Sequence, residues 1–349
     1  MAVFIAKKLL YSLLVLFGIA TIVFLLFSVL PGDPARMMLG QRADQESVEA
    51  ISHELGLDQP LATQYIGFLN DVSPIGTIPN GDLETRSHIS IASLDARTLA
   101  LKFPYLRRSF QLDRNVSEVL FDALPGTAVL AVLAISMALF FGILFGIFGA
   151  LHKGGWLDRT LMVMSIFGMS LPSFVAAILV VWVFAFLLGD WTGLPVTGSL
   201  YSIDEFEGPQ LMWRNMILPV FTLGIRPLAI LMQLTRNSML DVLSHDYVRT
   251  AVAKGLPQTT VIWKHTLKNA LNPVITAASG WFASLLAGAV FVEIVFGWQG
   301  LGSVILNALN TYDIPVVMGA VILVSGVFVV ISLAVDLLYG IFDPRVRIQ

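Results

Sequence analysis

Residues Thr127–Leu151 read TAVLAVLAISMALFFGILFGIFGAL, a run of 25 residues without a charged side chain. About 20 consecutive apolar residues allow a helix to cross the hydrocarbon core of a bilayer. The run therefore predicts a membrane-spanning helix. Its glycines Gly142, Gly146 and Gly149 have the spacing typical of close helix–helix contacts in membranes.

Five further apolar runs predict five more spans. We therefore expect an all-α, polytopic membrane protein with six transmembrane helices. The run nearest the N-terminus, Leu9–Leu30, follows Lys7 and Lys8 but is longer than the apolar core of a cleaved signal peptide. We therefore expect that helix to be retained. The other predicted spans are Leu9–Leu30, Thr160–Leu188, Met216–Thr235, Val274–Gly297 and Ile314–Ile341.

Composition excludes several classes of protein. Of the 349 residues, 56% are hydrophobic and 13% are charged, which excludes a disordered chain. The net charge of -3 excludes a basic nucleic-acid-binding protein. Disulfides and thiolate metal sites are excluded because the chain has no cysteine, and the five histidines are scattered. We expect neither a metal nor a cofactor.

The basic residues predict the orientation in the membrane. The N-terminus, His152–Arg159, Arg236–Pro273 and the C-terminus carry 11 lysines and arginines together, whereas the short loops between them carry only Arg214. Because short cytoplasmic loops are enriched in Lys and Arg, both termini are predicted to be cytoplasmic.

The segment Pro31–Gly126 would then be external. It predicts a short helix that ends at Gly56, a second helix capped by Asp58, and a third that ends at Leu124. Residues 71–104 look irregular. The segment is either a linker over the outer mouth or a docking surface for an external partner, and both interpretations stay open.

The predicted cytoplasmic loop Arg236–Pro273 is long enough, at 38 residues, to have its own structure. Asp246 can cap a helix that contains Val248 and Ala251, and Gly255 can end that helix in the left-handed conformation. A helix–turn–helix that reads DNA is disfavoured because both ends enter the membrane. A structural elbow remains possible, but we favour a helix that docks into the groove of a cytoplasmic partner.

The loop sequence Asp246–Leu256, DYVRTAVAKGL, resembles the EAA loop of binding-protein-dependent ABC transporter permeases, in particular the dipeptide/oligopeptide branch. Arg249-Thr250-Ala251 occupies the E-A-A place, and Lys268 stands where proline is usual. By this resemblance, the ATPase-coupling residues are Asp246, Tyr247, Val248, Arg249, Ala251, Lys254, Gly255 and Leu256.

The resemblance extends along nearly the whole chain, in matching order and spacing. Relative to typical members, residues 71–104 look like an insertion. The other matching stretches are Pro31–Ala35, Leu55–Leu61, Trp156–Arg159, Ser170–Phe174, Val292–Glu293, Phe296–Gly302, Asp336–Tyr339 and Asp343–Arg345.

The resemblance implies a type I ABC importer fold: helix 1 in residues 1–30, an external segment 31–126, a five-helix core 127–341 and a cytoplasmic tail 342–349. It also implies two separate ABC ATPase subunits, a second homologous permease, an external solute-binding protein and a peptide-like substrate. The chain agrees in lacking the G-x-x-x-x-G-K-[ST] nucleotide motif. We expect contact with membrane lipid but not with nucleic acid, in the cytoplasmic (inner) membrane of a prokaryote.

Three charges lie inside the predicted spans, where ionisable side chains are costly and often functional. Arg226 can pair within the bundle or line the translocation pathway and attract a peptide carboxylate. Glu293 can be a capped or snorkelling carboxylate near the outer end, or a pathway residue that gates or contacts a substrate amine. Asp336 is expected to pair with a basic loop residue.

Other function classes fit less well. An ion-driven secondary transporter is disfavoured by the absence of an internal repeat and of a dense set of membrane acids. A membrane-embedded enzyme would need clustered His, Glu or Asp near one face, and the sequence shows no such cluster. A structural scaffold would leave the predicted cytoplasmic helix pair unexplained, in which a second helix with Val261, Ile262 and Leu267 follows Pro257.

Overall fold

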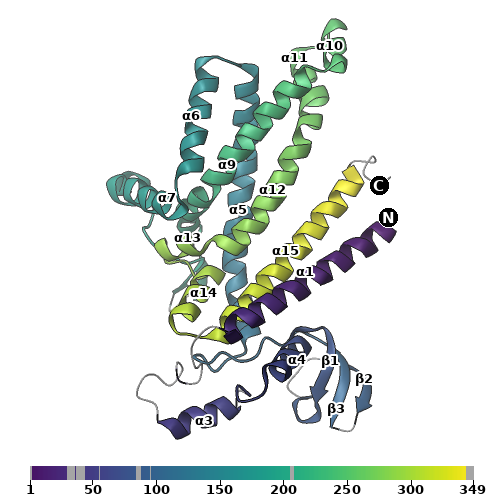
Figure 1. Ribbon diagram of the computed structural model, residues 1–349. Coiled ribbons are helices and arrows are strands. Elements are labelled where there is room, and N and C mark those ends of the chain that lie inside the picture. Colours follow the sequence, from purple (N-terminus) through teal and green to yellow (C-terminus); the bar gives the residue numbers. More distant parts are fainter. Residues whose placement is uncertain are drawn as a thin grey trace. The chain divides into compact units, whose positions relative to one another are not determined.

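The computed structural model describes residues 2–29, 36, 44–54, 56–83, 88–94, 96–204 and 208–342, and these are mostly helical (Figure 1). The motif at 31–35 and the tail 343–349 lie outside the described residues, as does the side chain of Asp336. The chain divides into two compact units. Unit 1 comprises Met1–Asp122 and Val304–Val329, and unit 2 comprises Ala123–Ser303 and Val330–Gln349.

The helices of unit 1 pack through a small apolar cluster. Phe24 of α1 and Phe68 of α4 are buried and their rings lie 5.5 Å apart, with Met318 and Ile322 of α15 packed against them. Tyr65 of α4 shares a 2.8 Å hydrogen bond with Thr21 of α1. The helices with residues in this unit are α1 (Ala2–Val29), α3 (Gln45–Glu54), α4 (Leu61–Val72) and the first part of α15 (Ile314–Phe342).

A three-stranded antiparallel sheet corrects the prediction of an all-α chain and of an irregular stretch at 71–104. Its strands are β1 (Ile75–Pro79), β2 (His88–Leu94) and β3 (Arg97–Lys102), in the order β1-β3-β2. On β3, buried and more exposed residues alternate, as expected for a strand with one covered face. Pro79 and Gly76 within β1, and Pro74, Gly81 and Pro104 beside the strands, hid this alternation.

Two predicted helix boundaries in unit 1 are also wrong. The N-cap of α4 is Pro60, without a side-chain cap, rather than Asp58. Helix α5 (Val116–Leu151) does not end at Leu124 but continues through Pro125 into the apolar run. The turn after α3 is as expected, because Gly56 has a φ of +66°.

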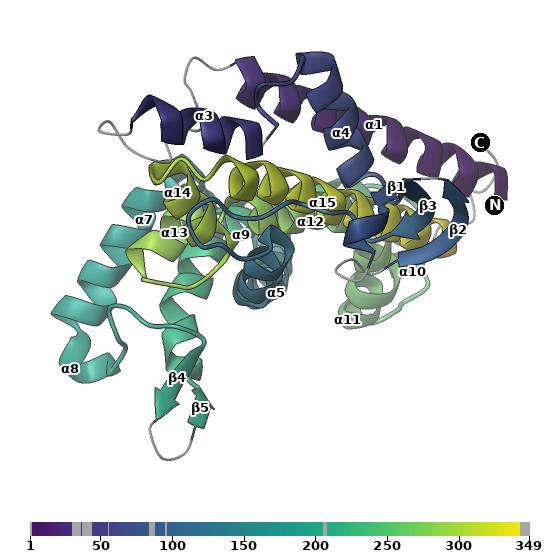
Figure 2. The same cartoon turned by 90° about the horizontal axis from the view of Figure 1, so that it is seen from below.

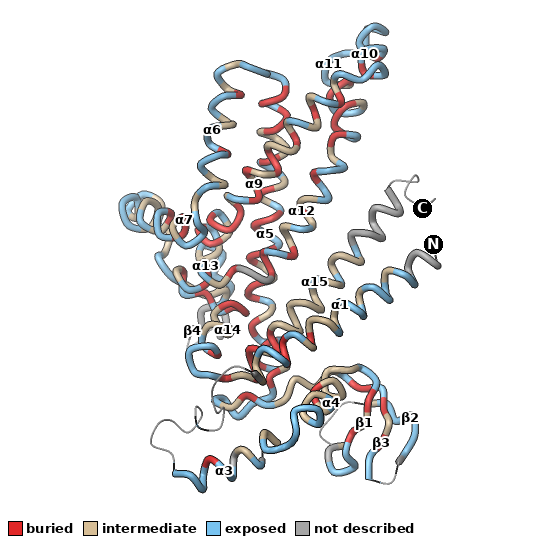
Figure 3. Tube along the Cα trace, viewed as in Figure 1, coloured by how far each residue is buried: buried red, intermediate tan, exposed pale blue. Residues whose placement is uncertain are grey.

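Unit 2 is built around α5, α9 and α12. Figure 1 shows α9 beside both α6 and α12, and Figure 2 shows α9 close to α12 in the second view. Figure 3 shows the buried residues concentrated along α5 and α9. A Cβ on Gly142 or Gly146 of α5 would press against Leu231 or Thr235 of α9, so the glycine spacing does mark a close contact. The remaining elements are α6 (Trp156–Ser170), α7 (Ser173–Val180), a π-helical stretch Val181–Leu187, α8 (Gly189–Thr192), the hairpin β4 (Tyr201–Asp204) and β5 (Gly208–Leu211), α9 (Trp213–Leu243), α10 (Asp246–Ala253), α11 (Gln258–Thr260), a π-helical stretch Val261–Leu267, α12 (Lys268–Gly288), α13 (Val290–Val295) and α14 (Leu301–Asn310).

Two of the six predicted spans are not single helices. Helices α6 and α7 are bent by 111° at Leu171-Pro172, because proline lacks an N–H and disfavours the helical conformation at the residue before it. The run Val274–Gly297 is divided at Ala289 into α12 and α13. Within the described ranges, four helices are long and apolar enough to cross a membrane, or five if α6 and α7 form one span.

The long loop Arg236–Pro273, which is predicted to be cytoplasmic, is mostly helical. Helix α9 continues eight residues past the predicted end at Thr235, and the helical stretch that begins at Gln258 runs on through Pro273 into α12. Only residues 244–257 connect these helices, and they contain α10. In Figure 1, α10 and α11 lie at the far end of α9 and α12.

Candidate functional site

Helix α10 is anchored by its apolar face. Val248 is 2% exposed, and with Ala251 it belongs to a buried cluster that includes Ile147 of α5, Met239 of α9 and Ile262. Apolar positions three residues apart lie on one side of a helix. Since the cluster joins three segments, α10 is fixed to the ends of α5 and α9 instead of hanging on a loose loop.

The start of α10 differs from the prediction. Its N-cap is His245, in extended conformation, and Asp246 is the first helical residue without a side-chain cap. The Asp246 carboxylate is almost fully exposed, with Arg249 3.7 Å away. An acidic residue in the first turn still interacts favourably with the helix dipole, which explains why the sequence pattern pointed to a helix start here.

The end of α10 confirms the prediction for Gly255. Its φ is +75°, its N–H donates to the carbonyl of Val252, and the N–H of Leu256 donates to the carbonyl of Ala251. This pair of bonds is the Schellman motif, which needs a residue in the left-handed conformation and so favours glycine. The turn fixes the direction in which Leu256 and Pro257 leave the helix.

The outer face of α10 and its turn is exposed and mixes apolar with basic side chains. Tyr247 is 43% exposed and Val252 59% exposed, and Asn269 donates a 2.7 Å hydrogen bond to the Tyr247 hydroxyl. We call this surface the α10 face; it consists of Tyr247, Arg249, Val252, Lys254 and Leu256.

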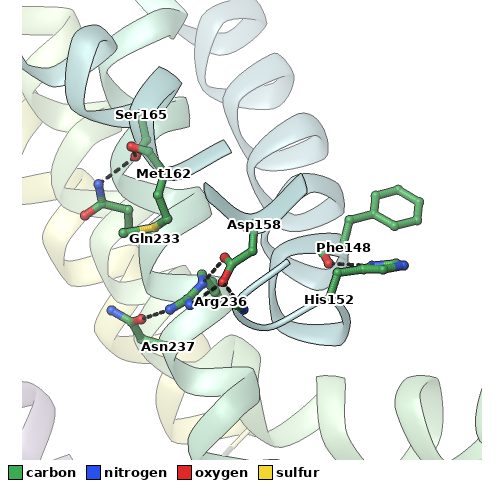
Figure 4. Close-up of polar contacts among 9 residues, drawn as sticks. Phe148, His152, Asp158, Met162, Ser165, Gln233, Arg236 and Asn237 are labelled. Atoms are coloured by element: carbon green, nitrogen blue, oxygen red, sulfur yellow. Dashed lines mark hydrogen bonds and ion pairs between the residues drawn. The ribbon is translucent and has the colours of Figure 1, made fainter. Parts of the chain in front are cut away.

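An ion pair links α6 to α9 at the end of unit 2 that carries α10. Figure 4 shows the Asp158 carboxylate at the start of α6 against the Arg236 guanidinium of α9, whose Nη2 lies 2.8 Å from Oδ2. The side chains are 5% and 17% exposed. The N–H of Gly154 donates to the same carboxylate. About one turn from Arg236 on α9, Gln233 donates to Ser165 of α6. These bonds hold α6 against α9 near the base of α10.

Breaking this pair should destabilise the protein. In Asp158→Ala, the guanidinium of Arg236 loses its charged acceptor, so we expect a loss of about 2 kcal/mol in the free energy of unfolding. Thermal unfolding of the purified protein measures the effect as a lower Tm. The matched control is Asp190→Ala, because Asp190 is exposed and has no ion pair among the described residues. Equal Tm values for the two variants would show that the pair is not structural.

Arg226 lies on α9 immediately before Pro227, with its guanidinium carbon 5.8 Å from the ring centroid of Trp281 on α12. Its side chain is exposed, and no carboxylate in the described part of the chain pairs with it. Of the interpretations left open by the sequence, the salt bridge within the bundle is therefore not found among these residues.

Glu293 does not snorkel to the membrane surface, because it is 0% exposed. One carboxylate oxygen accepts a 2.7 Å hydrogen bond from the Thr127 hydroxyl, and the other accepts a 3.0 Å bond from the N–H of Ser303. Ser303 is in the first turn of α14, so Glu293 caps that helix from a different segment. Negative charge is favourable at a helix N-terminus.

Glu293 is part of a larger buried network. The Thr127 hydroxyl also accepts the N–H of Leu301 at 2.8 Å, and the indole N–H of Trp298 donates to the carbonyl of Gly126 at 3.1 Å. A Cβ on Gly300 would lie 2.5 Å from the Glu293 carboxylate, which explains the glycine there. Sequence reasoning missed Thr127, since a hydroxyl at the edge of an apolar run gives no signal of a distant partner. We call this network the Glu293 clasp; it comprises Gly126, Thr127, Glu293, Trp298, Leu301 and Ser303.

Within the described ranges, no three His, Asp or Glu side chains are arranged to hold a metal ion. Three features therefore stand out: the exposed α10 face, the exposed Arg226 beside Trp281, and the buried Glu293 clasp.

Comparisons with known proteins identify the family of this chain. The family described as "Binding-protein-dependent transport system inner membrane component" matches residues 142–348, and the N-terminal family of the same membrane component matches residues 1–131. The dipeptide transport system permease protein DppB of Alkalihalophilus pseudofirmus is 33% identical over 98% of both chains. The di/tripeptide permease protein DppB of Pseudomonas aeruginosa is 35% identical over 99% of both.

A glutathione transport system permease protein, GsiC of Escherichia coli, is 35% identical over 99% of this chain and 98% of its own. Among solved structures, the inward-facing MetNI methionine ABC transporter has a similar fold, with a TM-score of 0.52 and 15% identity over 65% of this chain and 97% of that one. This protein therefore belongs to the binding-protein-dependent transport system inner membrane components, as a multi-pass permease subunit of an ABC transporter whose ATP is hydrolysed by separate subunits.

Proposed function

We propose that this permease forms the pathway by which dipeptides, oligopeptides or related small solutes enter a prokaryotic cell through its cytoplasmic membrane. It would work with a second homologous permease, two ABC ATPase subunits and an external solute-binding protein. The names of the full-length relatives support the solute class. The observation that carries the coupling role is the anchored α10 with its exposed outer face.

The coupling argument is mechanical. Val248 and Ala251 fix α10 to the ends of α5 and α9, so a push on the α10 face moves those helices as one body. Closure of the ATPases would in this way drive the permease from inward-facing to outward-facing. The apolar side chains of the face suit a groove, and Arg249 and Lys254 favour an acidic rim.

We also propose the six-span topology with cytoplasmic termini. In unit 2, the cluster under α10 includes the end of α5, so the α5–α6 turn and the α10 loop share one end. The segments His152–Arg159 and Arg236–Pro273 supply seven of the predicted cytoplasmic basic residues, which favours that end as cytoplasmic. The α6–α7 and α12–α13 pairs would then be the third and fifth spans. Residues 31–126 would be external, with the sheet around 71–104 as the apparent insertion.

For the pathway itself, we propose that Arg226 lines it and that Glu293 supports its wall from inside the protein. An exposed guanidinium within an apolar span is costly against lipid, so it favours a water-filled passage. The Glu293 carboxylate, in contrast, is fully occupied by Thr127 and α14.

The function is tested by reconstituting the permease with its partner subunits in vesicles. We expect uptake of a labelled dipeptide that needs ATP and the binding protein and is blocked by vanadate. Uptake driven by an ion gradient, without the ATPases, would contradict the proposal and favour a secondary transporter.

The coupling face is tested separately by cross-linking. Because the chain has no cysteine, a single introduced cysteine reports one position. We expect Val252→Cys to cross-link to an ATPase subunit and the control Trp191→Cys, which is 92% exposed on α8, not to do so. Cross-linking from Trp191→Cys but not from Val252→Cys would place the ATPase near α8 and would contradict the proposed coupling face.

A further inference from the structure

A cavity of about 120 Å³ lies in unit 2 where the break between α6 and α7 faces α9 and α12. Leu171 and Ser173 line it on either side of the break, Arg226 on α9, and Trp281 and Ser284 on α12. It is distinct from the α10 face and from the Glu293 clasp, since it shares no residue with either.

Arg226 is the chemically decisive residue of this cavity. Its guanidinium lies over the indole ring of Trp281, a cation–π contact that holds the side chain in place without neutralising it. No hydrogen bond or ion pair joins it to another residue in the described part of the chain. A cation in a membrane span needs an anion or water, and a cavity beside it provides space for both.

The break at Pro172 adds to the positive potential. Helix α7 begins at Ser173, and the first N–H groups of a helix have no partner within it. Their partial positive charge lies at the cavity wall, because Ser173, the first residue of α7, lines it. The hydroxyls of Ser173 and Ser284 are further hydrogen-bond donors. A guanidinium, a helix N-terminus and two hydroxyls together match a carboxylate.

We propose that this cavity is a subsite for the carboxylate of the solute in transit. The inference rests on the proposed function and deepens it. A volume of about 120 Å³ accommodates a carboxylate and a few adjoining atoms, so the rest of a peptide would remain in the pathway. A site that binds the C-terminal carboxylate, which all unmodified peptides share, does not select among their side chains. An exposed cation also binds weakly enough for release, as conduction requires.

The test compares a dipeptide with a free C-terminal carboxylate and the same dipeptide as its amide. In the reconstituted transporter, Arg226→Gln should reduce uptake of the free acid about tenfold, the effect of losing one charge-assisted bond. Uptake of the amide should change little. The binding protein is the same in every assay, so the change in the acid-to-amide ratio isolates the permease.

The matched control is Arg214→Gln. Arg214 lies on the same helix, with its guanidinium carbon 5.5 Å from the ring centroid of Trp213, but it does not line the cavity. We expect this variant to keep the wild-type ratio. If Arg226→Gln also keeps it while wild-type uptake is normal, the subsite is wrong and the proposed function stands. If wild type imports neither peptide with ATP, the proposed function fails, and the subsite with it.

A second measurement does not depend on turnover. In a Ser284→Cys transporter, the free acid should slow maleimide labelling of the cysteine, and the amide should not. Adding Arg226→Gln should remove the protection. Equal protection by acid and amide, or protection that survives Arg226→Gln, would overturn the carboxylate subsite.

Discussion

Glu293→Ala is expected to cause a severe loss of stability and, with it, of functional permease in the membrane. Removing the carboxylate leaves the Thr127 hydroxyl and the Ser303 N–H without their acceptor at a position that is 0% exposed. Each unsatisfied buried donor costs about 1–3 kcal/mol, so the loss of the acceptor for both donors costs about 2–6 kcal/mol. Thermal unfolding in detergent and the amount of protein in membranes measure the loss.

Variants of Thr127 provide the graded control. Thr127→Ser keeps the hydroxyl that bridges Glu293 and Leu301 and should remain close to wild type. Thr127→Val has a similar shape but lacks the hydroxyl, so its Tm should fall between those of Thr127→Ser and Glu293→Ala. If Thr127→Ser and Thr127→Val unfold at the same temperature, the hydroxyl bridge does not stabilise the protein.

Gly255→Leu should abolish ATP-driven uptake while the protein still inserts into the membrane. A side chain at a φ of +75° costs about 1–2 kcal/mol and disfavours the Schellman turn, so Leu256 and Pro257 would leave α10 in another direction. No atom lies within 4 Å of the added Cβ, so the effect acts through the backbone. Uptake and ATP hydrolysis by reconstituted transporter are compared, with membrane content as the reference.

Two controls separate coupling from strain. Gly255→Asn should retain partial uptake, because asparagine tolerates the left-handed conformation better than other side chains. Gly154→Leu introduces the same strain at a φ of +76°, also in open space, but in the turn between α5 and α6. We expect it to lower stability without uncoupling ATP hydrolysis from uptake. Normal uptake by Gly255→Leu would remove the basis of the coupling role.

Long uninterrupted patterns could be read from the sequence. The apolar runs that begin at Thr127 and Ile314 lie within single long helices, α5 and α15, and the run that begins at Leu9 lies in α1 as far as Val29. Gly255 was predictable because a helix end and a left-handed residue are local properties. The continuous hydrophobicity of Thr160–Leu188, in contrast, concealed the bend at Pro172. Hydropathy reports how well side chains suit an apolar environment and carries no information on the direction of the helix axis.

Features that depend on distant partners could not be read. The alternation along Arg97–Lys102 is too short to identify a strand by itself, and it acquires meaning only when β1 and β2 pair with that segment on both sides. Likewise, Glu293 could be singled out as an ionisable residue in an apolar run, but its partner is 166 residues away. The sequence therefore indicated that the carboxylate matters without indicating what it holds.

The separation of 166 residues between Thr127 and Glu293 also means that the two partners are synthesised at different times. Ribosomes add about 5–20 residues per second, so the hydroxyl is made about 10–30 s before the carboxylate that it will bind. During that interval, the Thr127 hydroxyl and the Gly126 carbonyl of α5 lack the partners, Glu293 and Trp298, that they have in the folded protein. This corner of the permease is thus completed late, and a chain that stops before Ser303 can never close it.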